Sequence, residues 1–325
     1  MSMNDVLVNL SAEPNQVILG WLERANALVS AKRVVSLPDT CPGKSPVPTG
    51  TGYMTDVSDW RRFALSDVGC GIAVVRTSLT FADTTSQGFR DAWDGVCADL
   101  GARRNQGLGD LGSGNHFLDA VVSYEDESVG LVVHTGSRKE SGLVDDLVDR
   151  PAEFDREFER IKGWAKSNRD AVLEIAERHL GRFVDLYPGV RSLDRNHNHF
   201  EERGDGVLIR KGSQRVEPGE LALIPSNLLD DMVIVRATAR VEELMHCLPH
   251  GTGRTMSRSD AKRATEAFDF GAMRQTVYIP ERITDASLRT EAPICYRALD
   301  DGLALVSEYV EVVERLVPVA YIGQL

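Results

Sequence analysis

Apolar residues recur at helical spacing in several stretches of the chain. Residues 17–29 and Phe89 to Leu100 each carry a single apolar stripe, and each stripe predicts a helix. A third stretch, from about 151 to 185, keeps this period with one weak step at Asn168 and is flanked by many charges. It predicts an amphipathic helical insertion of one or two helices, without chemistry of its own. A last helix is expected over 302–317, before strand-like residues 317–322.

Short β-branched runs separate these helices and predict strands at 34–37, 71–79 and 128–134. Three further runs, at 207–213, 221–225 and 232–235, follow in quick succession, which favours antiparallel or mixed sheets over repeated βαβ units. Residues 38–50 are too rich in proline and glycine for regular structure and predict a loop. No repeat, low-complexity tract or clear linker interrupts the pattern. We therefore expect an α/β (α+β) protein with one domain over residues 1–325.

Composition limits the class of protein. With 42% hydrophobic and 26% charged residues the chain is ordinary for a globular protein. No apolar run approaches the 18 or so residues of a membrane span, and the N-terminus lacks a secretory signal pattern. Five widely spread cysteines indicate reduced thiols, so we expect a cytoplasmic protein without a membrane partner.

The net charge of −12 argues against a surface that coats nucleic acid broadly, but it leaves room for a local basic site. Residues 251–265 provide one, with four cations against the single acid Asp260: Arg254, Arg258, Lys262 and Arg263.

The stretch from His246 to Arg258 contains the sharpest candidate chemistry. His250 stands between Pro249 and Gly251, which predicts a tight turn. Arg254 and Arg258 would share one face if a helix followed the glycines. A nucleophilic imidazole beside cations that hold phosphate is one arrangement for nucleotidyl transfer. The alternative is a loop histidine with two solvated arginines.

Metal-competent side chains gather beside glycine turns and strand ends, as a site on a rigid scaffold requires. They are Asp67, Cys70, His116, His134, His197, His199 and His250. This mixture of donors suits Mn, Fe, Co or Zn better than Mg or Ca. Each has a plain alternative: a buried thiol, a structural cap at His116, a core histidine at His134, or a surface pair at 197 and 199 that shares a strand face. His179 and His246 lie in helix-like contexts, and we expect His179 to be an ordinary surface or packing histidine.

Six motifs occur in an order that resembles the RtcB family of RNA-splicing ligases. They are Asp67-Val-Gly-Cys-Gly-Ile72, Gly112-Ser-Gly-Asn-His-Phe117, His134-Thr-Gly-Ser-Arg138, His197-Asn198, Arg210-Lys-Gly-Ser213 and His250-Gly-Thr-Gly-Arg-Thr-Met-Ser-Arg258. Leu37-Pro-Asp39 with Gly43 is similar to a further family motif, Pro-Asp-x-His-x-Gly, with Cys41 where the family has histidine. The resemblance runs from about residue 33 to 258.

The resemblance implies the α/β fold of these ligases, with the site in a central cleft. Asp67, Cys70, His116, His134 and His197 would hold one or two Mn²⁺ ions, with the Cys70 thiolate able to bridge them. His250 would attack the α-phosphate of GTP and form a histidine–GMP intermediate. The RNA 3′-phosphate or 2′,3′-cyclic phosphate end would then be joined to a 5′-hydroxyl end. Asn115 and Lys211 would contact the nucleotide, and Arg138 and Arg254 would hold phosphates of the nucleotide or the RNA.

Two departures from the family's motifs concern the pocket that would bind the guanine base of the nucleotide. The family's Pro-Gly-Ser-Met-Gly stretch reads Pro225-Ser-Asn-Leu-Leu-Asp230 here, and Ile322 stands where the family has a terminal lysine. GTP specificity is therefore open, as are the alternatives of a metal-dependent 2′,3′-cyclic phosphodiesterase that does not ligate, a non-catalytic RNA-binding paralogue and an unrelated metalloenzyme.

Overall fold

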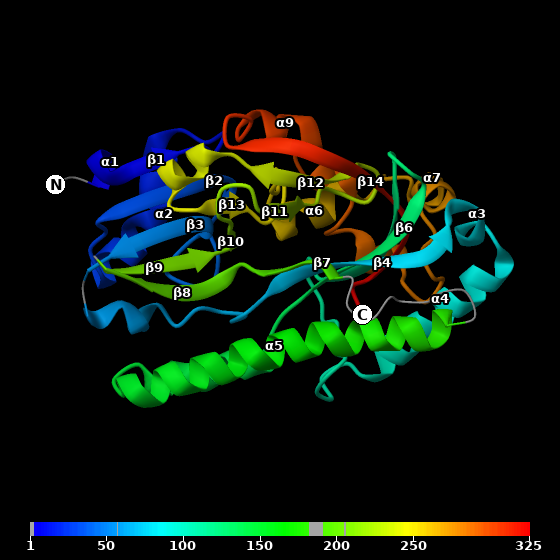
Figure 1. Cartoon of the computed structure of the whole chain (residues 1–325), viewed down its shortest axis with the longest axis horizontal. Coiled ribbons are helices and arrows are strands. Elements are labelled where there is room, and N and C mark those ends of the chain that lie inside the picture. The colour runs from blue at the N-terminus through cyan, green and yellow to red at the C-terminus, as the bar shows by residue number, and fades with distance from the viewer. Residues whose placement is uncertain (1–2, 57, 182–190, 205) are drawn as a thin grey trace.

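Two sheets carry most of the chain (Figure 1). The computed structural model describes residues 3–56, 58–181, 191–204 and 206–325. The first sheet has the strand order β1-β2-β3-β9-β8, and only its β1–β2 pair is parallel. Its strands are β1 (Leu7–Asn9), β2 (Arg33–Cys41), β3 (Thr49–Thr55), β8 (Asn198–Arg203) and β9 (Gly206–Lys211).

The second sheet is antiparallel and has the order β11-β12-β14-β5-β6-β4-β7. Its strands are β4 (Gly71–Thr80), β5 (Phe117–Ser123), β6 (Ser128–Thr135), β7 (Arg191–Asn196), β11 (Leu221–Ile224), β12 (Met232–Ala237) and β14 (Val310–Gly323). A short antiparallel pair, β10 (Ser213–Arg215) and β13 (Cys247–Pro249), contacts strands of both sheets and links them. The mixed α/β architecture confirms the fold class.

The helices lie around the sheets. They are α1 (Met3–Val6), α2 (Asn15–Leu28), α3 (Phe81–Thr84), α4 (Gln87–Ala102), α5 (Pro151–Leu180), α6 (Arg258–Ala264), α7 (Phe270–Thr276), α8 (Asp285–Leu288) and α9 (Leu299–Ala304). Four 3₁₀ helices, η1 (Ser58–Phe63), η2 (Arg138–Leu147), η3 (Ala239–Leu244) and η4 (Pro293–Cys295), complete the description. None of the described helices is both long enough and apolar enough to cross a membrane.

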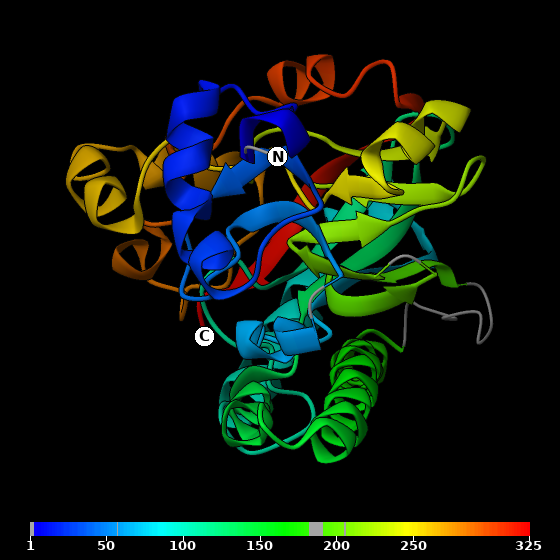
Figure 2. The same ribbon diagram turned by 90° about the vertical axis from the view of Figure 1, so that its left-hand side faces the viewer.

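The long helix α5 runs below the sheets beside α4 (Figures 1 and 2). Its apolar stripe, which includes Phe158, Ile161 and Val172, is buried, as the sequence predicted. The weak step at Asn168 is buried too: its amide accepts from Gly109 N at 2.8 Å and donates to Asp110 O at 2.9 Å. Through Asn168, helix α5 therefore holds the neighbouring loop at Gly109 and Asp110 in place. It is one helix as far as Leu180, and the expected boundary at 185 lies outside the described residues.

Two sequence expectations are wrong. Residues 302–317 do not form one helix: α9 ends at Ala304, and Val310 onward lies in β14, which pairs with β12 and β5 on its two sides. The β-branched residues of that run fit a pleated strand with two hydrogen-bonded neighbours better than an exposed helix. Likewise, residues 38–41 continue strand β2, and the register shift between Ser36 and Cys41 accommodates Pro38.

Candidate metal centre and adjoining pocket

One edge of the seven-stranded sheet brings the candidate ligands together. Cys70 directly precedes β4, His116 directly precedes β5, His134 lies near the end of β6, and His197 directly follows β7. These strands are neighbours in the order β5-β6-β4-β7, and His134 pairs with both Ile72 and Phe117. Because the strands are antiparallel, the start of β4 and β5 and the end of β6 and β7 meet at one edge. Residues separated by up to 127 positions in sequence therefore become neighbours.

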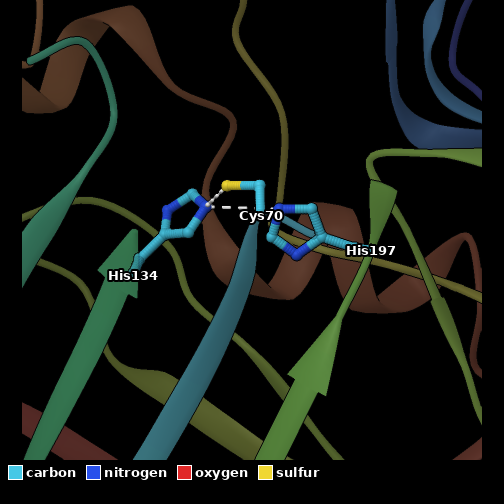
Figure 3. Close-up of side chains that lie close together, drawn as sticks. All are labelled: Cys70, His134 and His197. Atoms are coloured by element: carbon cyan, nitrogen blue, oxygen red, sulfur yellow. Dashed lines mark hydrogen bonds between the residues drawn. The ribbon is translucent and has the colours of Figure 1, made fainter. Parts of the chain in front are cut away.

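Two groups of donor atoms share Cys70. In the first group, Cys70 Sγ and His197 Nε2 each lie 3.3 Å from His134 Nε2 (Figure 3). In the second, His116 Nε2 lies 3.3 Å from Cys70 Sγ and 3.0 Å from Asp67 Oδ2. Within each group the donor atoms are within 4.8 Å of one another. The structure thus brings together all five residues that the resemblance assigned to metal.

Several features of the first group fit a metal ion. His134 Nδ1 donates to the carbonyl oxygen of Asn115 at 2.9 Å, which leaves a lone pair on Nε2. That lone pair faces the thiol of Cys70 and Nε2 of His197, an arrangement that one cation would satisfy. His197 Nδ1 is buried and has no partner among the described residues. The imidazole and thiol donors of this group suit a borderline divalent ion, as does the second group with its Asp67 carboxylate.

Burial sets the protonation of these groups in the metal-free chain. It lowers the pKa of His134 and His197 well below the usual range, so both are neutral and able to ligate. Burial also raises the pKa of the Cys70 thiol, and the Asp67 carboxylate raises it further. Burial raises the pKa of Asp67 as well, but His116, Lys211 and Arg138 more than offset this, and the net shift is downward. A bound cation would reverse the shift at Cys70 and favour the thiolate.

Helix α5 holds the turn that presents Asp67 and Cys70. Gly69 in this turn has φ +70°, and a Cβ there would lie 3.0 Å from the Ala165 side chain, so a larger residue would not fit. The buried Arg169 donates to Gly69 O at 2.9 Å and to Thr135 O at 3.3 Å. Helix α5, which the sequence predicted to lack chemistry, therefore provides none of the candidate ligands described above. It supports the chain next to two of these ligands, Cys70 and His134.

His250 lies next to this cluster, at the bend that follows β13. Its ring centroid is 4.7 Å from that of His197 and 6.1 Å from that of His134. Asp39 Oδ2 accepts from His250 N at 3.1 Å and also from His250 Nδ1. Since Nδ1 carries the proton, Nε2 keeps its lone pair. Gly253, at φ +87°, allows this contact, because a Cβ there would lie 2.7 Å from Asp39 Cα.

A cavity of about 350 Å³ joins His250 to the cluster. Asn115, Lys211, Arg254 and Arg258 line it, as expected for residues that would meet a nucleotide or phosphate. Lys211 Nζ donates to Ser66 O at 2.6 Å. Burial lowers the pKa of Lys211, and nearby Asp67 acts against that shift.

Arg254 and Arg258 do not share a helix face, because α6 begins only at Arg258. Arg254 instead donates to Thr290 O at 2.6 Å and to Tyr296 OH at 3.1 Å. Its Nη2 is buried and has no partner among the described residues, so one donor stays available.

Arg138 donates to His116 Nδ1 at 3.0 Å and is not among the described residues that line the cavity, so its contact with phosphate stays a prediction. Two other expectations need correction. His199 was expected to share a face with His197. Because His197 lies between β7 and β8 and His199 lies on β8, only His197 joins the cluster, while His199 lines a second cavity. His246 is not in a helix either; it has φ +60° and its Nδ1 lies 2.9 Å from Glu217 Oε2.

Sequence reasoning missed five acidic or phenolic groups around the cavity: Asp39, Asp119, Glu291, Tyr296 and Tyr321. Asp39 belongs to a quoted motif, so its signal was present. Asp119 follows the Asn115-His116-Phe117 motif by two residues, but nothing in the sequence marks it as buried. Burial raises its pKa well above the usual range, and its Oδ1 has no partner among the described residues.

The altered loop does reach the cavity. Ser226, Asn227 and Leu228 line it, so at Ser226 a side chain stands where the family has the first glycine of this stretch. Ile322 is fully buried in the hydrophobic core, and its neighbour Tyr321 lines the cavity instead.

The fold and the cluster define a mixed α/β protein with the donor set of a metal centre. A family model described as tRNA-splicing ligase RtcB matches residues 155–324, more than half of the chain. The chain therefore belongs to the RtcB family, which confirms the resemblance. RNA-splicing ligase RtcB1 and RNA-splicing ligase RtcB of strain K12, both from Escherichia coli, are each 24% identical to it, with 77% of this chain and 80% of the relative covered. RNA-splicing ligase RtcB2 of Escherichia coli is 27% identical, with 72% of each chain covered.

Proposed function

We propose that the protein is an RNA ligase or end-repair enzyme that works through a histidine–GMP intermediate on His250. It would join RNA 3′-phosphate or 2′,3′-cyclic phosphate ends to 5′-hydroxyl ends. The observation that carries this proposal is the contact of His250 N and Nδ1 with Asp39 Oδ2 beside the Asp67–Cys70–His cluster. The names of the Escherichia coli relatives support the substrate class.

Asp39 prepares His250 for nucleophilic attack. Its carboxylate accepts a hydrogen bond from Nδ1–H, so the imidazole presents an unprotonated Nε2, and the carboxylate stabilises the positive charge that develops on the ring during attack. His250 Nε2 would attack the α-phosphorus of GTP, the N–P bond would form, and the bond to pyrophosphate would break. The product is GMP linked to His250 through a phosphoramidate.

The following steps transfer and then release GMP. A 2′,3′-cyclic phosphate end would first be opened by water, which breaks the bond to the 2′-oxygen and leaves a 3′-phosphate. An oxygen of the RNA 3′-phosphate would then attack the phosphorus of the phosphoramidate and break the N–P bond, which returns His250 to its free form and leaves the RNA end activated. The 5′-hydroxyl oxygen would then attack the activated 3′-phosphorus, lose its proton and displace GMP. Lys211, Arg254 and Arg258 line the cavity and would orient the phosphates by charge-assisted hydrogen bonds. Asn115 would contact the nucleotide.

Asp67, Cys70, His116, His134 and His197 would hold one or two Mn²⁺ ions. When bound, such an ion supplies Lewis acidity that neutralises charge on phosphate oxygens. The chain's own contribution is to hold these donors in a buried pocket next to His250, with His134 fixed in the ligating tautomer by Asn115 O.

Incubation with Mn²⁺ and GTP radiolabelled at the α-phosphate tests the proposal. The protein should acquire an acid-labile label, and His250→Ala should abolish the label while still binding Mn²⁺. His179→Ala is a matched control, because His179 lies on α5 and contacts Asp99. Label on the His250→Ala protein would contradict the nucleophile. Absence of label, with opening of 2′,3′-cyclic phosphates retained, would favour a phosphodiesterase instead.

A further inference from the structure

Arg138 occupies the side of His116 that faces away from the candidate metal site. Its Nη1 donates to His116 Nδ1 at 3.0 Å, so Nδ1 is an acceptor and the ring proton lies on Nε2. That Nε2–H faces Asp67 Oδ2 at 3.0 Å, and Asp67 Oδ1 accepts in turn from Arg138 N at 3.1 Å. The three residues form a closed ring of hydrogen bonds, complete without a metal.

This ring conflicts with metal binding by His116. A neutral imidazole has one lone pair, so it cannot accept from Arg138 through Nδ1 and ligate through Nε2 together. If Nε2 ligates, the proton moves to Nδ1, where it would face Arg138 Nη1–H across 3.0 Å. A guanidinium cannot accept that proton, because it has no acceptor and does not deprotonate. His134 has no such conflict, because its Nδ1 faces a carbonyl oxygen.

A second partner for Arg138 lies close by. Arg138 Nε is buried with no hydrogen-bond partner among the described residues, and it lies 3.8 Å from Asp110 Oδ2. Asp110 is itself buried and accepts from Asn105 N at 3.1 Å. Gly112 makes room for the guanidinium, because a Cβ there would lie 2.1 Å from Arg138 Cζ. A small shift would exchange a hydrogen bond to His116 for one to Asp110.

We propose that Arg138 is a positioning residue that controls metal loading of the Asp67–Cys70–His116 group. Its guanidinium leaves His116 when a metal binds and pairs with Asp110, while the His116 proton moves from Nε2 to Nδ1. In the metal-free chain the same guanidinium holds His116 in the tautomer that cannot ligate. This inference rests on the metal site of the proposed function and assigns Arg138 a task other than holding phosphate.

Titration with Mn²⁺ alone, followed by calorimetry, tests the proposal through a double-mutant cycle. Arg138→Met keeps the length of the side chain but removes its donors, and it should tighten Mn²⁺ binding to this group at least about tenfold. Asp110→Asn should weaken binding in the wild-type background but have little effect in the Arg138→Met background. Affinity at the Cys70–His134–His197 group should change little, because that group lacks the conflict.

Loss of positive charge alone would give a different pattern. If Arg138 and Asp110 acted on the bound ion through their charges alone, their effects would add, whereas the exchange of partners makes the effects strongly non-additive. Lys211→Met removes another cation near Asp67 and Cys70 without touching His116, so it should tighten binding less than Arg138→Met. Additive effects, or equal effects of the two substitutions, would overturn the proposal.

A spectroscopic measurement checks the tautomer directly. In protein loaded with Zn²⁺ as a diamagnetic probe, ¹⁵N NMR should show a proton on His116 Nδ1, and in metal-free protein a proton on Nε2. An unprotonated Nδ1 that still accepts from Arg138 in the loaded protein would contradict the exchange. Failure of every variant to bind Mn²⁺ would reject the metal site and this inference together. Metal binding with an additive cycle would reject this inference alone.

Discussion

Asp39 and His250 are 211 residues apart in sequence, yet one carboxylate oxygen of Asp39 accepts from both His250 N and His250 Nδ1. The contact fixes the backbone and the ring of His250 together. It therefore sets the direction in which Nε2 points as well as the tautomer.

Replacing Asp39 by asparagine should slow transfer of GMP to the protein. The shape is kept, but the amide no longer provides the charged acceptor that selects the Nδ1–H tautomer. Hydrogen bonds to charged groups are worth about 1.5–3 kcal/mol, so we expect a rate roughly 10- to 150-fold lower. The measurement is the initial rate of labelling from radiolabelled GTP. Asp59→Asn, at a half-exposed carboxylate paired with Arg62, is the control, and an equal rate in both variants would contradict the role of Asp39.

Cys70→Ser should weaken Mn²⁺ binding at both donor groups, because Cys70 belongs to each of them. Serine retains the size but not the soft thiolate that these ions accept as a ligand. Metal affinity and stoichiometry should be measured by calorimetry. Cys97→Ser is a matched change of a buried thiol in the hydrophobic core, and it should reduce stability while leaving metal stoichiometry unchanged. Unchanged affinity in Cys70→Ser would exclude thiolate ligation.

The metal-free protein should lose stability as the pH falls below about 6.5, the ordinary pKa of an unfolded histidine. Burial, together with Arg210, Lys162 and Arg215, holds the folded pKa of His199 well below that value. Below pH 6.5 the His199 imidazole therefore binds a proton in the unfolded chain but not in the folded chain. Each such histidine contributes a slope of about 1.4 kcal/mol per pH unit to the free energy of unfolding.

Denaturant titrations at several pH values measure this slope. His134 and His197 are shifted in the same direction, so the wild type should be steeper than a variant that lacks one of the three. His199→Asn should reduce the slope by the contribution of one proton. Above pH 7 the substitution should not alter how the free energy of unfolding depends on pH. A slope equal to that of the wild type would mean that His199 takes up a proton in the folded chain.

Discrimination between GTP and ATP should be weak. Side chains of Ser226, Asn227 and Leu228 line the cavity, with Ser226 at a position where the family has glycine, and buried Ile322 replaces the terminal lysine. Loss of a hydrogen bond to a charged group corresponds to roughly 10- to 150-fold in affinity, so ATP should label the protein at a comparable rate. Parallel labelling with the two nucleotides measures this. A strong preference for GTP would point to another base contact, and Asp119→Asn would then test the buried carboxyl in the cavity.

Arg169→Met on α5 should reduce both stability and metal affinity. The guanidinium donates to Gly69 O and Thr135 O, which adjoin Cys70 and His134, and it pairs with Asp194 at 3.0 Å. Breaking a buried pair by removing one partner costs about 3–5 kcal/mol. Thermal unfolding and Mn²⁺ titration should both change. Lys166→Met, at a side chain 58% exposed on the same helix, should change neither, and normal metal affinity in Arg169→Met would show that the turn is held by other contacts.

Local pattern predicted most of the helices and strands, because α4 and α5 have a helical periodicity that their burial repeats, and β6 is a β-branched run that is buried along its length. It failed at β14, where valines and charged residues alternate irregularly and only pairing with β12 and β5 decides the structure. The prolines between residues 38 and 48 predicted a loop, but in the structure strand β2 continues to Cys41. Strand pairing is a tertiary property, and local periodicity does not contain it.

The sequence predicted which residues form the candidate site, but it did not predict how their side chains are arranged. The ordered motifs named His250 and the five candidate metal ligands, which lie together in the structure. They did not reveal that Arg138 donates to His116 or that Asp39 meets His250, because both contacts depend on how turns far apart in sequence face each other. For the same reason the sequence did not separate His197 from His199.

The position of β14 has a consequence for when the site can exist. It is the last described strand in the chain, yet it lies in the interior of its sheet, between β12 and β5. The hydrogen-bond ladder that links β11 and β12 to the strands bearing His116 and His134 is therefore missing until residue 323 has been synthesised. Ribosomes add about 5–20 residues per second. For several seconds, therefore, a nascent chain contains all its candidate metal ligands while its larger sheet still lacks β14. During this time β12 and β5 would each have one unpaired edge, and chaperones could bind there.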